Sequence, residues 1–140
     1  IDSPITVNGE EWKITALATG NPHAVTFVDD VDSLDLEKIG PMFENHSLFP
    51  DRVNTEFVKV IGDNVLQMRV WERGSGETFA CGTGACAVAS AAVKLGICKP
   101  DTEINIKLKG GGLYITVSSD FDITMKGLAV TVYDGEWIND

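Results

Sequence analysis

The first half of the chain consists of short apolar runs separated by turn residues, a pattern typical of β-strands. Strands are expected over residues 5–7, 12–18, 24–28, 56–61 and 65–71. Asn8-Gly9 lies between the first two runs, and Gly62-Asp63-Asn64 lies between the last two. Because such residues favour tight turns, both pairs of strands are expected to form hairpins.

A short helix is expected between the third and fourth of these runs. Three apolar residues recur at the spacing of one helical face: Leu36, Ile39 and Phe43. Asp32 or Ser33 precedes them as the candidate N-cap, and the helix is expected to end near Glu44. Pro41 falls inside this helix, where it is expected to split or kink it.

Small residues dominate the segment from Gly82 to Leu95, which predicts a helix buried on several sides. Gly96 is well placed to end this helix. Alternating runs then follow over residues 104–108, 113–117, 123–125 and 130–133. Alternation indicates antiparallel strands with one solvated face. The whole pattern predicts an α+β fold, in which a mostly antiparallel, curved and barrel-like sheet wraps around one central helix.

The composition is that of one globular domain covering residues 1–140, with 44% hydrophobic and 23% charged residues. No apolar run is long enough to cross a membrane, so no membrane partner is expected. The formal net charge of -10 disfavours binding to nucleic acid. Since the first residue is Ile1 rather than Met, the chain is expected to be processed or cut from a larger protein.

The three cysteines are an odd number, so no closed disulfide framework is expected, and a reduced, cytoplasmic location fits best. Their positions, Cys81, Cys86 and Cys98, include no Cys-x-x-Cys pair. With only two histidines in the chain, a metal site is not expected.

Cys81 stands directly before the predicted small-residue helix, and Gly82 and Gly84 follow it. The first N–H groups of a helix lack internal partners and lie at the positive end of its dipole. Both effects favour a thiolate and predict a lowered thiol pKa for Cys81. The same N–H groups could hold a substrate carboxylate, which the glycines would let approach closely. The alternative is that Cys81 is a small buried residue at a tight turn.

Gly82, Gly84 and Ala87 also satisfy the dinucleotide-binding pattern G-x-G-x-x-G/A. That fold needs a buried parallel strand on each side of the helix. The preceding segment, residues 77–81, is too polar for such a strand, and the following strand alternates. Nucleotide binding is therefore the least favoured function.

Three segments resemble the C-terminal half of diaminopimelate epimerases. They are Gly-Asn-Pro-His-Ala-Val at 20–25, Phe-Pro-Asp-Arg-Val-Asn-Thr-Glu-Phe at 49–57, and the stretch from Trp71 to Cys86. They occur in the family's order, and the resemblance extends from about Ile5 to the end of the chain. It implies one of two pseudo-symmetric domains, as in proline racemases, with the active site between the domains. It also implies an enzyme that needs neither pyridoxal phosphate nor another cofactor nor a metal.

In this family two cysteines face opposite sides of the substrate α-carbon. One removes the α-proton as a thiolate while the other delivers a proton as a thiol, so that LL- and meso-diaminopimelate interconvert. By resemblance, Cys81 is the second of these catalytic cysteines. Gly82 and Thr83 match the positions whose backbone N–H groups bind the α-carboxylate.

The resemblance assigns further roles to five residues. Glu72 and Arg73 match a pair that contacts the substrate, and Glu72 could also tune the catalytic thiol. Asn21 and Asn54 match side chains that hold the distal amino-acid end of diaminopimelate. His23 matches a histidine that adjusts the acidity of the partner cysteine. Without the resemblance, these residues would be a solvated charge pair, two turn residues and a structural histidine.

Enzymes of this family are about twice as long as this chain, and their first half carries the other cysteine in a Cys-Gly-Asn helix start. Cys86 and Cys98 lack glycine-rich neighbours and are expected to be core residues. The chain is therefore expected to be the C-terminal catalytic half of an epimerase of lysine and peptidoglycan precursor synthesis. Its expected partners are the missing N-terminal domain and, in the full enzyme, a second subunit of a homodimer.

Alone, the chain is expected to fold without epimerising. Two alternatives remain open at this point. One is an epimerase or racemase of the same architecture that acts on another amino acid. The other is a non-catalytic module that binds a carboxylate at the helix N-terminus.

Overall fold

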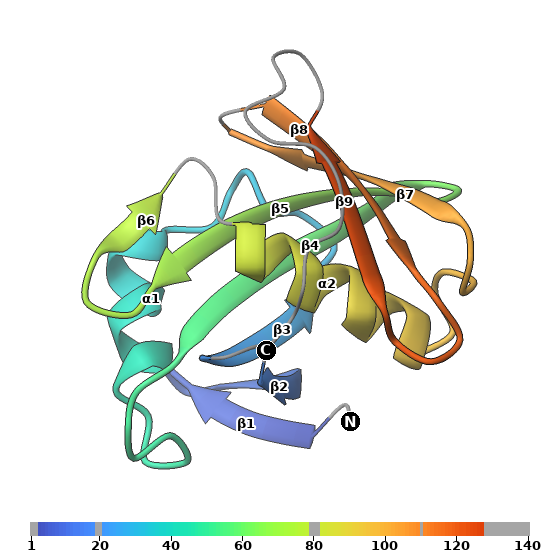
Figure 1. Cartoon of the computed structure of the whole chain (residues 1–140). Coiled ribbons are helices and arrows are strands. Elements are labelled where there is room, and N and C mark those ends of the chain that lie inside the picture. Colours follow the sequence, from blue (N-terminus) through green and yellow to red (C-terminus); the bar gives the residue numbers. More distant parts are fainter. Residues whose placement is uncertain (1–2, 19–20, 79–81, 110, 128–140) are drawn as a thin grey trace.

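A computed structural model describes residues 3–18, 21–78, 82–109 and 111–127 (Figure 1). Within these residues the strands are β1 (Ser3–Val7), β2 (Glu10–Ala18), β3 (Pro22–Phe27), β4 (Asn54–Gly62), β5 (Val65–Glu72), β6 (Gly76–Thr78), β7 (Glu103–Leu108), β8 (Gly111–Val117) and β9 (Ile123–Gly127). The helices are α1 (Leu36–Glu44) and α2 (Gly82–Lys94). This combination confirms the predicted α+β class.

The strands form one mixed sheet in the order β1-β2-β3-β4-β5-β7-β8-β9, and β6 pairs with β5. Most neighbours are antiparallel, but β3 with β4 and β5 with β7 are parallel. Parallel neighbours need a crossover connection, which α1 supplies for the first pair and α2 for the second. The predicted curved, mostly antiparallel sheet is confirmed, and the described strands leave it open rather than closed into a barrel.

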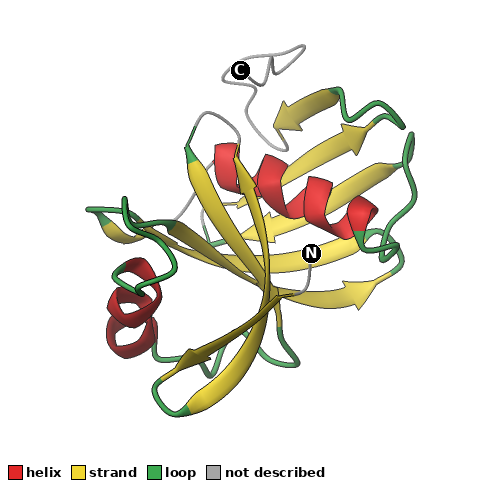
Figure 2. Ribbon diagram, turned by 90° about the horizontal axis from the view of Figure 1, so that it is seen from below, coloured by secondary structure: helices red, strands yellow, loops and turns green. Residues whose placement is uncertain are grey.

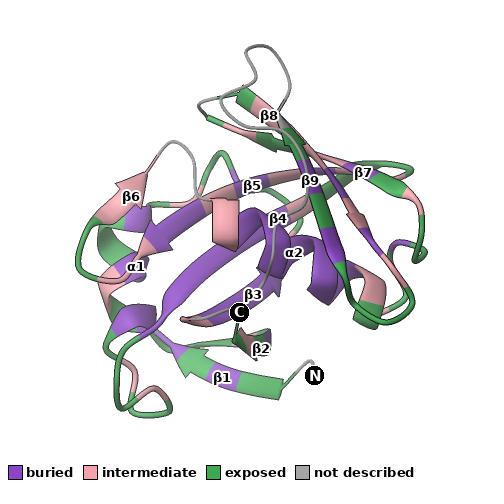
Figure 3. Ribbon diagram, viewed as in Figure 1, coloured by how far each residue is buried: buried purple, intermediate pink, exposed green. Residues whose placement is uncertain are grey.

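The two helices lie on opposite faces of the bent sheet, as Figure 2 shows. Val58 of β4 packs in the cluster around α2, whereas the adjacent Phe57 packs in the cluster around α1. Successive side chains of a strand point to opposite faces, so the middle of the sheet is covered on both sides. The interior of α2 is buried throughout, from Gly84 to Ala92 (Figure 3). This confirms the predicted central helix.

Local turn chemistry produced the most accurate predictions. Asn8 and Gly9 both have positive φ, 52° and 78°, between the paired residues Val7 and Glu10. Positive φ at both positions is what a two-residue hairpin of type I′ requires. Gly96, with φ of 78°, ends α2 and donates its N–H to the carbonyl of Val93.

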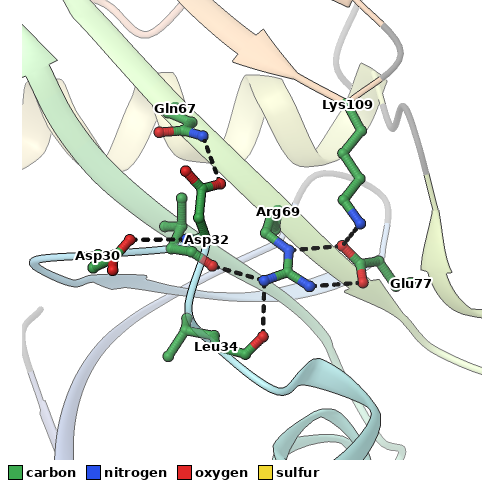
Figure 4. A network of polar contacts seen from close by, with 8 residues as sticks. Asp30, Asp32, Leu34, Gln67, Arg69, Glu77 and Lys109 are labelled. Atoms are coloured by element: carbon green, nitrogen blue, oxygen red, sulfur yellow. Dashed lines mark hydrogen bonds and ion pairs between the residues drawn. The ribbon is translucent and has the colours of Figure 1, made fainter.

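The predicted start of α1 is wrong. The helix begins at Leu36, with Asp35 at its N-cap position and no side-chain cap, instead of after Asp32 or Ser33. The loop before the helix stays non-helical, because Arg69 donates hydrogen bonds to the carbonyl of Leu34 and to that of Val31 (Figure 4).

Pro41 does not split α1, which runs as one helix to Glu44. The proline removes one donor, which would have bonded the carbonyl of Glu37, and Glu37 is exposed. The short strand β6 had not been predicted. The strand expected over 130–133 lies outside the described residues.

Candidate active site

The predicted site residues on β3, β4 and β5 gather at one end of three adjacent strands. His23 on β3 is the register partner of Asn54 on β4. Asn54 is the first residue of β4 and Glu72 is the last residue of the antiparallel strand β5. Asn21 stands just before β3, and Arg73 just after β5. Three segments that are far apart in the sequence therefore bring these five residues to the same end of the three strands.

His23 is buried and has a partner at each ring nitrogen. Its Nδ1 lies 2.7 Å from Oε2 of Glu56, and both side chains are fully buried. Its Nε2 lies 3.2 Å from Oδ1 of Asn21. Two contacts of this kind fix the orientation of the imidazole ring.

Glu56 is the partner that the sequence analysis did not identify. Burial raises the pKa of its carboxyl group to about 7, the hydrogen bond and charge of His23 oppose that rise, and the charge of Glu72 adds to it. Its other oxygen, Oε1, has no hydrogen-bond partner within the described part of the chain. One available signal was its place on β4 two residues from Asn54 and from Val58, which are both buried. An acidic residue in phase with buried neighbours marks a buried charge.

Asn54 ties together two segments of the candidate site. Its Nδ2 donates to the carbonyl of Pro22 at 3.1 Å. Its Oδ1 accepts the backbone N–H of Arg73 at 2.7 Å. One amide side chain thus fixes both the start of β3 and the loop that follows β5.

The loop after β5 is held from further directions. The guanidinium of Arg73 donates to the carbonyl of Asp51 at 3.1 Å in an exposed contact. Glu72 accepts a hydrogen bond of 2.5 Å from Oγ1 of Thr78 on β6. The hydroxyl of Thr78 therefore occupies one oxygen of the Glu72 carboxylate.

The remaining predicted residues belong to the start of α2. Gly82 is the first residue of this helix and Thr83 the second, as the sequence predicted. Both are partly exposed, and the helix becomes buried from Gly84 onward. Cys81, which connects these residues to the preceding chain, lies outside the described residues.

Cys86 and Cys98 are both buried, as expected of core residues. Burial raises the pKa of the Cys98 thiol, which opposes reactivity. Within the described ranges, no three His, Cys, Asp or Glu side chains come together as a metal site would require. The described helices include none that is both long and apolar enough to cross a membrane.

Solved structures define the architectural class. A hydroxyproline epimerase from Agrobacterium vitis matches with a TM-score of 0.67 and 15% identity, over 97% of this chain and 43% of that chain. A phenazine biosynthesis protein of the PhzF family from Bacillus anthracis matches with a TM-score of 0.54 and 24% identity, over 83% of this chain and 38% of that chain. The fold is thus that of a domain found in hydroxyproline epimerase and PhzF proteins.

Sequence comparison defines the family. A family model described as diaminopimelate epimerase matches residues 15–132. The diaminopimelate epimerase of Desulfovibrio desulfuricans is 54% identical over 135 residues, which cover 96% of this chain and 46% of that relative. The one from Synechocystis is 50% identical over 137 residues, which cover 97% and 48%. The chain belongs to the diaminopimelate epimerase family, and it spans about half the length of the curated relatives it matches.

Proposed function

We propose that this chain is the C-terminal catalytic half of a diaminopimelate epimerase, which interconverts LL- and meso-diaminopimelate without pyridoxal phosphate. The observation that carries the proposal is the position of Asn54. Its side-chain amide donates a hydrogen bond to the carbonyl of Pro22, next to His23, and accepts one from the backbone N–H of Arg73. Residues that the family resemblance assigns to the substrate therefore belong to one hydrogen-bonded unit.

In this proposal Cys81 exchanges the α-proton on one face of the substrate as thiolate or thiol. The backbone N–H groups of Gly82 and Thr83 bind the α-carboxylate. The start of α2 at Gly82 supports this role, because the backbone N–H groups at a helix start and the positive end of its dipole favour an anion. They also favour the negative charge that develops as the proton leaves.

Asn21, Asn54 and Arg73 would hold the distal end of the substrate. The oxygens of both amides already face donors or ring nitrogens within the protein, namely Arg73 N–H and His23 Nε2. The NH₂ group of Asn21 then remains for a ligand, and Asn54, whose NH₂ already donates to the carbonyl of Pro22, has one N–H left. Together with a guanidinium, these donors suit a carboxylate. Glu72 would adjust the acidity of the Cys81 thiol, and His23 would adjust that of the partner cysteine.

The proposal includes an N-terminal domain that carries the second cysteine and, for the full enzyme, a homodimer in the cytoplasm. The half-length coverage of the relatives supports the additional domain. The odd number of cysteines supports a reducing compartment.

The decisive experiment follows α-deuterium incorporation into diaminopimelate in heavy water. The full-length protein that carries this sequence is expected to exchange and invert the substrate, whereas the 140-residue chain alone is expected to do neither. Cys81→Ala in the full-length protein should lower turnover by roughly 10²- to 10⁴-fold or more, because one acid/base group is lost. Cys86→Ala is the matched control on α2. Enzyme-like inversion by the isolated chain, or full turnover by Cys81→Ala, would refute the proposal.

A panel of other amino acids tests the nearest alternative, an epimerase of the same architecture with another substrate. A non-catalytic module would bind diaminopimelate without exchange and would be indifferent to alkylation of its thiols.

A further inference from the structure

Glu56 differs from the other carboxylates of the candidate site because it is fully buried and makes its hydrogen bond to a histidine. We propose that Glu56 is a positioning residue: its protonated carboxyl donates from Oε2 to Nδ1 of neutral His23, so that Nε2–H of His23 points to Oδ1 of Asn21. The effect on turnover rests on the proposed function, whereas the hydrogen-bond arrangement does not.

The proton count around His23 leads to this arrangement. Both ring nitrogens face an oxygen, Nδ1 at 2.7 Å and Nε2 at 3.2 Å. A neutral imidazole has only one N–H, so it satisfies both contacts only if one of the oxygens carries the second proton. The amide oxygen of Asn21 cannot carry it, but the carboxyl group of Glu56 can.

An imidazolium facing a carboxylate would also satisfy both contacts, but the surroundings of Glu56 disfavour it. Oε1 is buried and receives no hydrogen bond from any of the described residues, and an unpartnered carboxylate oxygen is costly to bury. Glu72, on the neighbouring strand β5, contributes a further negative charge that acts on Glu56. Burial and this charge both raise the pKa of Glu56, which lies at about 7, so the neutral carboxyl prevails on the acidic side of neutrality.

The proton on Glu56 also affects Asn21, a predicted substrate-binding residue. When Nε2–H of His23 donates to Oδ1 of Asn21, the NH₂ group of that amide must point the other way. A single buried proton would thus set which side of Asn21 faces a ligand. Glutamine in place of Glu56 keeps a donor for Nδ1, whereas leucine removes it.

Imidazole nitrogen NMR on the 140-residue chain tests the arrangement directly. The chain has only two histidines, so His46→Gln leaves His23 as the one labelled imidazole. At pH 6, His23 is expected to be the neutral Nε2–H tautomer in the parent and in Glu56→Gln. Glu56→Leu should lose this preference, whereas Val58→Ala, on the same strand and also buried, should keep it. An imidazolium or an Nδ1–H tautomer in the parent overturns the proposal, even if no leucine variant folds.

Kinetics of the full-length protein test the consequence for the site. Glu56→Leu should raise KM for diaminopimelate by about tenfold or more through Asn21, and Glu56→Gln should recover most of this loss. Loss of activity in Glu56→Leu with the His23 tautomer unchanged contradicts positioning through His23. If the parent protein has no epimerase activity, the proposed function fails while the NMR result still decides the role of Glu56.

Discussion

Two buried glutamates on opposite faces of the sheet, Glu44 and Glu56, differ in the number of hydrogen bonds that their carboxyl groups accept. Glu44, at the end of α1, accepts hydrogen bonds from the indole N–H of Trp71, the backbone N–H of Gly74 and the guanidinium of Arg52. Glu56, on β4, makes its side-chain hydrogen bond to His23, and its second oxygen has no partner among the residues that the structure describes. Glu44 has the partners that a buried carboxylate needs, and Glu56 does not.

Their pKa values move in opposite directions for this reason. Burial raises the pKa of Glu44, but hydrogen bonds from Trp71 and Gly74 and the nearby Arg52 outweigh burial, so its pKa lies below the usual range. At Glu56, burial dominates and the pKa rises to about 7. The first carboxylate stabilises the packing of α1, whereas the second holds a proton beside the candidate active site.

The largest expected effect comes from breaking the contact between α1 and the sheet. A methyl group at Gly40 would lie 2.6 Å from Cγ and Cε3 of the Trp71 indole, a ring that Glu44 holds in place. Gly40→Ala should therefore lower the free energy of unfolding by about 3 kcal/mol, as measured by urea denaturation of the chain. Lys38→Ala, exposed on the same helix, should change it by less than about 0.5 kcal/mol. Equal stability of the two variants would contradict this packing.

The two glutamates themselves are compared by the same substitution. Glu44→Gln turns an amide NH₂ toward donors and should cost about 2 kcal/mol of unfolding free energy at pH 6. Glu56→Gln retains a donor for His23 and should cost less than about 1 kcal/mol at that pH. Urea denaturation of both variants under identical conditions provides the measurement. A larger loss in Glu56→Gln than in Glu44→Gln would reverse the comparison.

The sequence predicted what depends on neighbours along the chain. The Asn8-Gly9 hairpin and the Gly96 helix end follow from backbone conformations that few residues adopt. The central helix α2 follows from its continuous small residues. The parallel pairings of β3 with β4 and β5 with β7 were not predicted, because alternation does not reveal which strands meet across a crossover.

The residues of the candidate site could not be predicted from their neighbours in the sequence alone. Asn21, Asn54 and Arg73 were identified by family resemblance, since an asparagine near a turn is ordinary turn chemistry. Glu56 was missed because its burial depends on His23, which is 33 residues away in the sequence. The start of α1 was misplaced because Arg69, on a distant strand, holds the preceding loop.

The pH dependence of stability provides a test with opposite signs for the two glutamates. The folded pKa of Glu56, about 7, exceeds the ordinary value of 4.5, so its contribution is complete below pH 4.5 and is lost as pH rises through 7. Between pH 5 and pH 8 this loss is on the order of 2 kcal/mol, and Glu56→Gln should lack it. The contribution of Glu44, whose pKa is lowered, is instead lost as pH falls below the ordinary range. Parallel stability curves for the parent and Glu56→Gln from pH 5 to pH 8 would contradict the raised pKa.

The smallest effect is expected at a third glutamate, which Arg69 and Lys109 both contact (Figure 4) and which is partly open to solvent. Glu77 receives two hydrogen bonds from Arg69, at 2.8 and 2.9 Å, and an ion pair from Lys109 at 3.0 Å. The Lys109 side chain is 45% exposed, and Arg69 alone keeps Glu77 satisfied. Lys109→Ala should therefore cost less than about 0.5 kcal/mol, and the cost should shrink as salt is added. Arg69→Ala is the matched comparison and should cost about 2 kcal/mol, because two backbone carbonyls lose their donor as well. Equal losses of unfolding free energy in Lys109→Ala and Arg69→Ala would contradict the view that buried hydrogen-bond partners determine how much each carboxylate contributes to stability.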